Sequence, residues 1–122
     1  MIGYTTVGAN DFAGTAKFYD ALFSSVGTGR LMEMDGFILW GSSMDATGFA
    51  LAKPYDGNAA TVGNGVMIAL RAESQAQVDA LYQAALELGG TDEGAPGPRG
   101  DGFYAGYFRD PEGNKLNAFF VG

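Results

Sequence analysis

The sequence repeats itself, and this internal repeat limits the folds that the chain can adopt. A shift of 63 residues places Tyr4 on Met67 and brings two helix-forming stretches into register. Further along, the tripeptide Asp-Gly-Phe that begins at Asp35 recurs at Asp101, at a shift of 66 residues. Single matches among common residues are weak, but the helices, caps and strand starts agree together, which indicates a duplicated structural unit.

Each half of the repeat is expected to contain one helix and four strands. Apolar residues at helical spacing predict helices over residues 11–24 and 75–88, the second opened by a capping box of Ser74 and Gln77. Short runs between Gly-rich turns predict strands at 2–8, 29–34, 37–42 and 48–53 in the first half, and at 65–72, 92–98, 104–109 and 114–121 in the second.

These elements predict an α+β fold in which two βαβββ modules form a curved mixed sheet. A chain of 122 residues has the length of a single domain. We expect that domain to span 1–122, with module 1 at 1–54, a linker at 55–64 and module 2 at 65–122. Because a half of about 60 residues is too small to bury a sheet alone, the modules are expected to pack together around a concave groove.

The composition excludes several classes of function. The net charge is −7 and the Lys and Arg residues do not cluster, so we expect neither nucleic acid nor a membrane as a partner. No apolar run reaches the roughly 18 residues of a membrane-spanning helix, and no signal peptide is expected. The chain has no Cys and no His, which removes disulfides, thiolate and imidazole ligands and the usual general base. The lack of Cys fits a cytoplasmic location.

Two stretches resemble a known superfamily. The first comprises Ile2–Gly8, Asn10–Phe12 and Lys17–Leu22, and the second is the closing segment Tyr107–Leu116. With the repeated βαβββ order, they make the chain similar to the vicinal oxygen chelate superfamily, which includes glyoxalase I, bleomycin-resistance proteins and extradiol dioxygenases. The resemblance covers essentially the whole chain and implies the fold and a homodimer, whereas the same fold hosts many functions.

The resemblance also implies where metal ligands would stand. Enzymes of the superfamily carry His on the first strand of each half and Glu on the last strand. By position these ligands fall on Tyr4, Met67 and Asn117, with Leu51 as the first-half partner of Asn117. A catalytic divalent ion favours imidazole, thiolate or carboxylate, and these four side chains offer none of them. We therefore expect no metal and no cofactor.

A groove lined by aromatic side chains is the remaining candidate site. Strand alternation predicts that Thr6, Ala69, Arg71 and Phe119 share a face with Tyr4, Met67 and Asn117. The candidate ligand-binding residues are Tyr4, Trp40, Phe49, Leu51, Met67, Arg99, Tyr104, Tyr107 and Asn117. The rings would form an apolar wall, and Arg99 would hold an anionic substituent. Alternatively, the rings are core or dimer contacts, and Arg99 pairs with Asp101 or faces solvent.

These observations favour a metal-free protein that binds a small aromatic or amphipathic ligand in the groove between the modules, in the manner of a bleomycin-resistance protein. The alternative is a glyoxalase-related lyase or isomerase with a non-standard active site, whose catalytic residues the sequence does not identify. A third hypothesis is a structural or regulatory partner protein, for which an unusually apolar exposed groove would be the sign.

Overall fold

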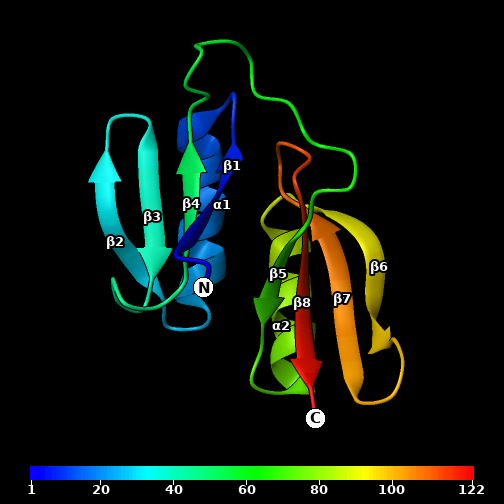
Figure 1. The fold of residues 1–122 in the computed structure, drawn as a ribbon. Coiled ribbons are helices and arrows are strands. Elements are labelled where there is room, and N and C mark those ends of the chain that lie inside the picture. The colour runs from blue at the N-terminus through cyan, green and yellow to red at the C-terminus, as the bar shows by residue number, and fades with distance from the viewer. The chain divides into compact units, whose positions relative to one another are not determined.

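The computed structural model describes residues 1–122 as two compact units, Met1–Val62 and Gly63–Gly122. Each unit contains one helix and one four-stranded mixed sheet, as Figure 1 shows. The sequence predicted this α+β fold with two βαβββ modules, and the structure confirms it. Neither helix is long and apolar enough to cross a membrane.

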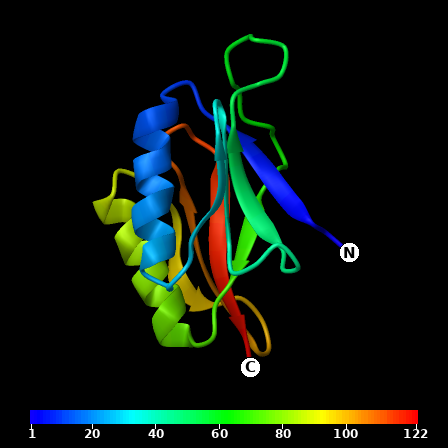
Figure 2. The same cartoon turned by 90° about the vertical axis from the view of Figure 1, so that its left-hand side faces the viewer.

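Unit 1 contains strand β1 (Tyr4–Gly8), helix α1 (Phe12–Ser24) and strands β2 (Gly29–Met34), β3 (Phe37–Gly41) and β4 (Gly48–Ala52). The strand order in its sheet is β1-β4-β3-β2, in which β1 and β4 run parallel and the other pairs run antiparallel. Helix α1 covers one face of this sheet (Figure 2).

The core of unit 1 is a cluster of aromatic rings between α1 and its sheet. Tyr19 and Phe23 lie on one face of α1, and both rings contact Trp40 on β3 and Phe49 on β4. The ring centroids are 4.6–5.8 Å apart in these four contacts, within the range of favourable aromatic pairs. The cluster fixes which face of the sheet is covered by the helix.

Unit 2 repeats this arrangement with strand β5 (Ile68–Arg71), helix α2 (Gln75–Glu87) and strands β6 (Thr91–Pro98), β7 (Phe103–Arg109) and β8 (Lys115–Val121). The strand order is β5-β8-β7-β6, with β5 and β8 parallel. Helix α2 buries Val78, Leu81 and Ala85 against this sheet, whose largest fully buried side chain is Phe108.

Both helices begin where the sequence predicts. The Asp11 carboxylate accepts a hydrogen bond from the Gly14 amide at 3.1 Å, and the Ser74 hydroxyl accepts one from the Gln77 amide at the same distance. Such caps satisfy backbone donors that have no partner inside the helix. In the second helix the Gln77 side chain reaches back to the amide of Glu73, one residue beyond the usual capping box.

The largest departure from the predicted elements is in the first strand of unit 2. Residues 65–72 were predicted as a strand, but β5 begins only at Ile68. The amide of Val66 donates to the carbonyl of Gly63 in a turn, and Gly65 has a φ of 99° that extended backbone does not adopt. Met67 therefore lies just before the strand rather than within it.

Candidate functional site

Each sheet has one face covered by its own helix and a second, helix-free face. In unit 2 the Tyr104 hydroxyl donates a hydrogen bond of 2.6 Å to Asp79 on α2, so Tyr104 lies on the helix side. Side chains alternate along β7, and the pairing of β7 with β8 is regular, which puts Tyr107 and its partner Asn117 on the helix-free face.

Asn117 is the most unusual residue on the helix-free face of unit 2. Its side chain is only 2% exposed, and its Oδ1 has no hydrogen-bond partner. Its neighbours across the sheet are Tyr107 on β7 and Ala69 on β5. A buried amide oxygen without a donor costs about 1–3 kcal/mol of stability, and no protein group donates to the Asn117 oxygen.

Cationic and aromatic side chains surround Asn117 on this face. The Arg99 guanidinium lies 5.6 Å from the centre of the Tyr107 ring and donates to the carbonyl of Ala95 at 2.7 Å. The predicted alternative, an ion pair with Asp101, is not formed, since Arg99 has no carboxylate within 4.0 Å. The other end of the face carries Arg71, 5.0 Å from the ring of Phe119.

The helix-free face of unit 1 is more apolar. Phe49 contacts α1, so its neighbours Ala50 and Ala52 on β4 point to the opposite face, together with their partners Thr6 and Phe37. Tyr4, two residues before Thr6, is 57% exposed and meets the Phe37 ring edge-to-face at 6.1 Å. These positions agree with the faces that strand alternation predicts for Tyr4 and Thr6.

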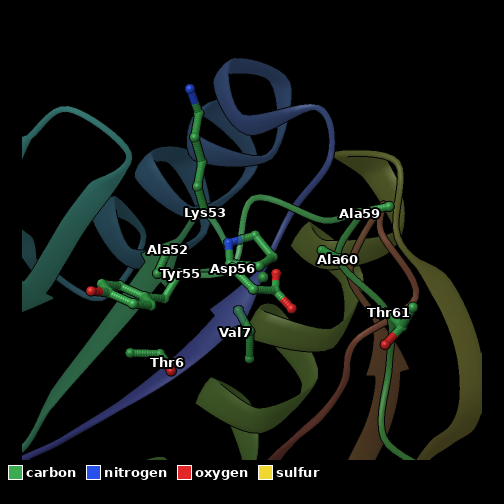
Figure 3. Close-up of a pocket in the computed structure, with 11 residues that line it drawn as sticks. Thr6, Val7, Ala52, Lys53, Tyr55, Asp56, Ala59, Ala60 and Thr61 are labelled. Carbon is green, nitrogen blue, oxygen red and sulfur yellow. The ribbon is translucent and has the colours of Figure 1, made fainter.

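A pocket of about 480 Å³ opens where β1 and β4 of unit 1 end. Figure 3 shows Thr6 and Val7 on one side and Ala60 and Thr61 on the other, with the Lys53 ammonium directed away. This volume falls within the roughly 300–1,000 Å³ of small-molecule sites. The far wall belongs to the stretch predicted as a linker, and for this reason the sequence did not identify it.

Asn10 fixes that wall of the pocket. Its Nδ2 donates to the Ala60 carbonyl at 3.1 Å, and its Oδ1 accepts from the Ala60 amide at 2.7 Å. Asp56 orders the preceding turn, because its carboxylate accepts from the backbone amide and the side chain of Asn58. The pocket is therefore held in shape by side chains on both sides of the loop.

Four predicted site residues lie on the helix side of their sheets rather than on the helix-free face. Trp40 is 1% exposed and packs with Phe49 in the aromatic core of unit 1, as the alternative of ordinary core contacts proposed. Leu51 is fully buried two residues after Phe49, on the same side. Tyr104 bonds to helix α2. Bulky side chains at these positions fill the space under the helices.

The first-half counterpart of Asn117 also changes. The shift of 63 residues relates Thr6 to Ala69, and Ala69 pairs with Asn117 while Thr6 pairs with Ala50. The counterpart is therefore Ala50 rather than Leu51. The predicted and observed counterparts differ by one residue. Because side chains alternate along a strand, a shift of one residue places the predicted side chain on the opposite face.

A carboxylate on the helix side of unit 1 is strongly held. Asp20 on α1 accepts from the Nε of Arg30 at 2.8 Å and from the indole N–H of Trp40 at 2.9 Å. The hydrogen bond from Arg30 lowers the pKa of the Asp20 carboxyl, assisted by the Trp40 bond and opposed by burial. Through these hydrogen bonds the Asp20 carboxylate holds β2 and β3 against α1.

The residues at the superfamily's metal positions do not fit a metal ion. Tyr4 and Met67 are 57% and 38% exposed, and Asn117 contributes a neutral amide. No group of three or more Asp, Glu, His or Cys side chains in the chain could hold a metal ion. Neutral oxygens and a thioether offset little of the cost of removing water from a hard dication.

Comparisons with known proteins identify the fold and the family. The family model of the Glyoxalase/Bleomycin resistance protein/Dioxygenase superfamily matches residues 1–118. A glyoxalase/bleomycin resistance protein from Albidiferax ferrireducens is 37% identical, with a TM-score of 0.92 over 100% of this chain and 99% of that one.

More distant structures share the fold alone. A glyoxalase-related enzyme from Fulvimarina pelagi is 20% identical, with a TM-score of 0.77 over 98% of this chain and 87% of that one. A lactoylglutathione lyase from Agrobacterium tumefaciens is 21% identical, with a TM-score of 0.72 over 98% of this chain and 92% of that one. None of the curated proteins matches. The family match covers nearly the whole sequence, and the chain therefore belongs to the glyoxalase/bleomycin resistance protein/dioxygenase superfamily.

Proposed function

We propose that this protein is a metal-free member of its superfamily that binds a small aromatic or amphipathic molecule, as a bleomycin-resistance-like binding protein. The observation that carries the proposal is the buried amide of Asn117, whose Oδ1 lacks a donor on the helix-free face of unit 2. A polar group that destabilises the empty protein is expected where a ligand supplies the missing hydrogen bond.

Two further features support ligand binding rather than a purely structural role. Tyr107 and Phe119 flank Asn117 on the helix-free face and offer apolar surface beside its amide. The pocket at the end of β1 and β4 combines apolar Val7 and Ala60 with the hydroxyls of Thr6 and Thr61. Apolar walls with a few fixed polar groups are typical of small-molecule sites.

A thermal-shift screen tests the proposal. The panel contains aromatic metabolites and drugs of negative, neutral and positive charge, measured with the wild-type protein and with Asn117→Leu. A ligand present at 100 times its Kd stabilises the folded state by about 2.7 kcal/mol. We expect at least one compound to raise the Tm of the wild type more than that of the variant. A panel in which no compound raises the Tm would refute the proposal.

The alternative, a glyoxalase-related lyase or isomerase, is separated by following a bound compound by NMR for chemical conversion. Size-exclusion chromatography with light scattering tests the homodimer, which we retain as a proposal together with a cytoplasmic location. Chemical conversion of the compound that is lost in Asn117→Leu would show that the protein is an enzyme rather than a binding protein.

A further inference from the structure

The basic residues of unit 2 gather on one face of its sheet, where a single carboxylate, that of Glu93, pairs with one of them. The chain carries a net charge of −7, yet every basic residue of unit 2 lies on one face. These residues are Arg71, Arg99, Arg109 and Lys115. Arg109 and Lys115 pair across β7 and β8 and share the face of Tyr107 and Asn117, because each is two residues from one of them. Arg71 pairs with Phe119 on the same face.

Three of these four cations have no carboxylate partner. Arg109 is neutralised by Glu93, with an Nη2 to Oε1 distance of 3.0 Å. Arg71, Arg99 and Lys115 form no salt bridge, and each lies 5.0–5.7 Å from the centre of an aromatic ring on the same face. The chain has twice as many acidic as basic residues, so its net charge is negative. Unpaired cations gathered on one face nevertheless produce a positive potential at that face.

Apart from Glu93, which pairs with Arg109, the carboxylates of unit 2 that have hydrogen-bond partners are held on the helix side or in turns. Asp79 accepts from Tyr104, and Asp92 accepts a bond of 2.7 Å from Tyr82 on α2. Asp110 is buried in the turn between β7 and β8, where its carboxylate accepts from the amides of Glu112 and Asn114. None of these carboxylates is bonded to Arg99 or Lys115. An anionic ligand could therefore bind these two cations without displacing a carboxylate of the protein.

Aromatic surface lies between the cations. Lys115 and Arg99 both approach the ring of Tyr107, with Nζ and Cζ at 5.7 and 5.6 Å from its centre. At the other end, Phe119 stacks on Phe103 with ring centroids 5.5 Å apart and an interplanar angle of 18°. The buried Oδ1 of Asn117 lies between these two groups along β8 and needs a donor.

From this arrangement we propose that the ligand of the helix-free face of unit 2 is a small organic anion, a carboxylate or phosphate on an aromatic or other apolar body that also carries an O–H or N–H donor. Lys115 and Arg99 would bind the anion, Asn117 would accept the donor, and Tyr107 and Phe119 would contact the body. This inference rests on the proposed ligand-binding function and names the chemical class of the ligand.

Three matched probes test the sign of the charge. 6-Hydroxy-2-naphthoate is titrated into ¹⁵N-labelled full-length protein beside its neutral amide and the corresponding aminomethyl compound, which share the ring and the phenol donor. We expect the carboxylate to bind at least about tenfold more tightly than the amide, the ratio for one charge-assisted hydrogen bond. We also expect it to shift the backbone resonances of Tyr107, Lys115 and Asn117.

Variants assign that preference to particular cations. Arg99→Gln with Lys115→Gln is expected to reduce carboxylate affinity about tenfold or more while leaving amide affinity unchanged. Lys17→Gln removes one positive charge from helix α1 in unit 1, against two in the double variant, and is expected to leave both affinities unchanged. The exposed positions of Arg99 and Lys17 make these variants compatible with folding.

Three results would overturn the inference in distinguishable ways. If the amide or the amine binds as tightly as the carboxylate, the face binds ligands without selecting anions, and the proposed function survives. If none of the three probes binds and the wider screen is also negative, both proposals fail. Resonance shifts confined to the pocket at the end of β1 and β4 would place the anion elsewhere and would likewise overturn it.

Discussion

The Asn117→Leu substitution should stabilise the empty protein and weaken its ligand binding. Leucine has nearly the same shape as asparagine but no polar atoms. In the native protein the amide is 2% exposed and its Oδ1, with less than 1 Å² of accessible surface, has no hydrogen-bond partner. Removing such a group recovers about 1–3 kcal/mol. Because 1 kcal/mol corresponds to about 3–5 °C in a chain of this size, the Tm is expected to rise by about 3–15 °C.

Thermal and urea unfolding monitored by circular dichroism measure this gain, and 6-hydroxy-2-naphthoate measures the loss of affinity. Losing one neutral hydrogen bond to the ligand should weaken binding about 3- to 10-fold. The matched control is Thr15→Val, because the Thr15 hydroxyl on α1 is the other buried side-chain oxygen without a partner. We expect this control to stabilise the protein without any change in affinity.

A loss of stability in Asn117→Leu would refute the reasoning. It would mean that the amide oxygen has a donor in solution, such as an ordered water, whose removal costs more than the desolvated amide. An affinity loss of the same size in Thr15→Val would show that binding responds to stability in general rather than to the amide.

Substitutions at two further positions test the structural groups around the site. Asp20→Ala should destabilise unit 1 by about 2 kcal/mol, because the buried indole N–H of Trp40 loses its acceptor, and Asp20→Asn should cost less. The hydrogen bond from Arg30 lowers the pKa of Asp20 from its ordinary value of 3.8. The Asp20 carboxylate therefore contributes its full stability above pH 3.8, and this contribution is lost as the pH falls through the lowered pKa. Urea unfolding of Asp20→Asn should lack this acid dependence. Asn10→Ala should speed hydrogen exchange at the Ala60 amide about tenfold or more while leaving the Asn117 region unaffected, and unchanged exchange would show that Asn10 does not hold the pocket wall.

The repeat in the sequence predicted the fold because its signals are local and occur twice. The apolar faces of α1 and α2 and their caps at Asp11 and Ser74 depend only on nearby residues. The faces of Tyr4, Thr6 and Asn117 followed from strand alternation for the same reason, since the period of two is a property of the single strand.

The sequence could not assign the faces of Trp40 or Tyr104, because that depends on contacts with residues distant in the chain. Trp40 is directed by Asp20 and by the aromatic core under α1, and Tyr104 by Asp79 on α2. The positive face of unit 2 was also missed. Arg71 and Arg99 were individually noted in the sequence, but only the sheet brings Lys115 beside Tyr107 and shows that no carboxylate neutralises it.

Metal analysis tests most directly the central claim that this chain binds its ligand without a metal ion. The protein is dialysed against Zn²⁺, Ni²⁺, Mn²⁺ and Fe²⁺ in turn, freed of excess ion and measured by elemental analysis. The positions of Tyr4, Met67 and Asn117 predict far less than one ion per chain. One tightly held ion per chain, lost in Asn117→Leu, would contradict the account.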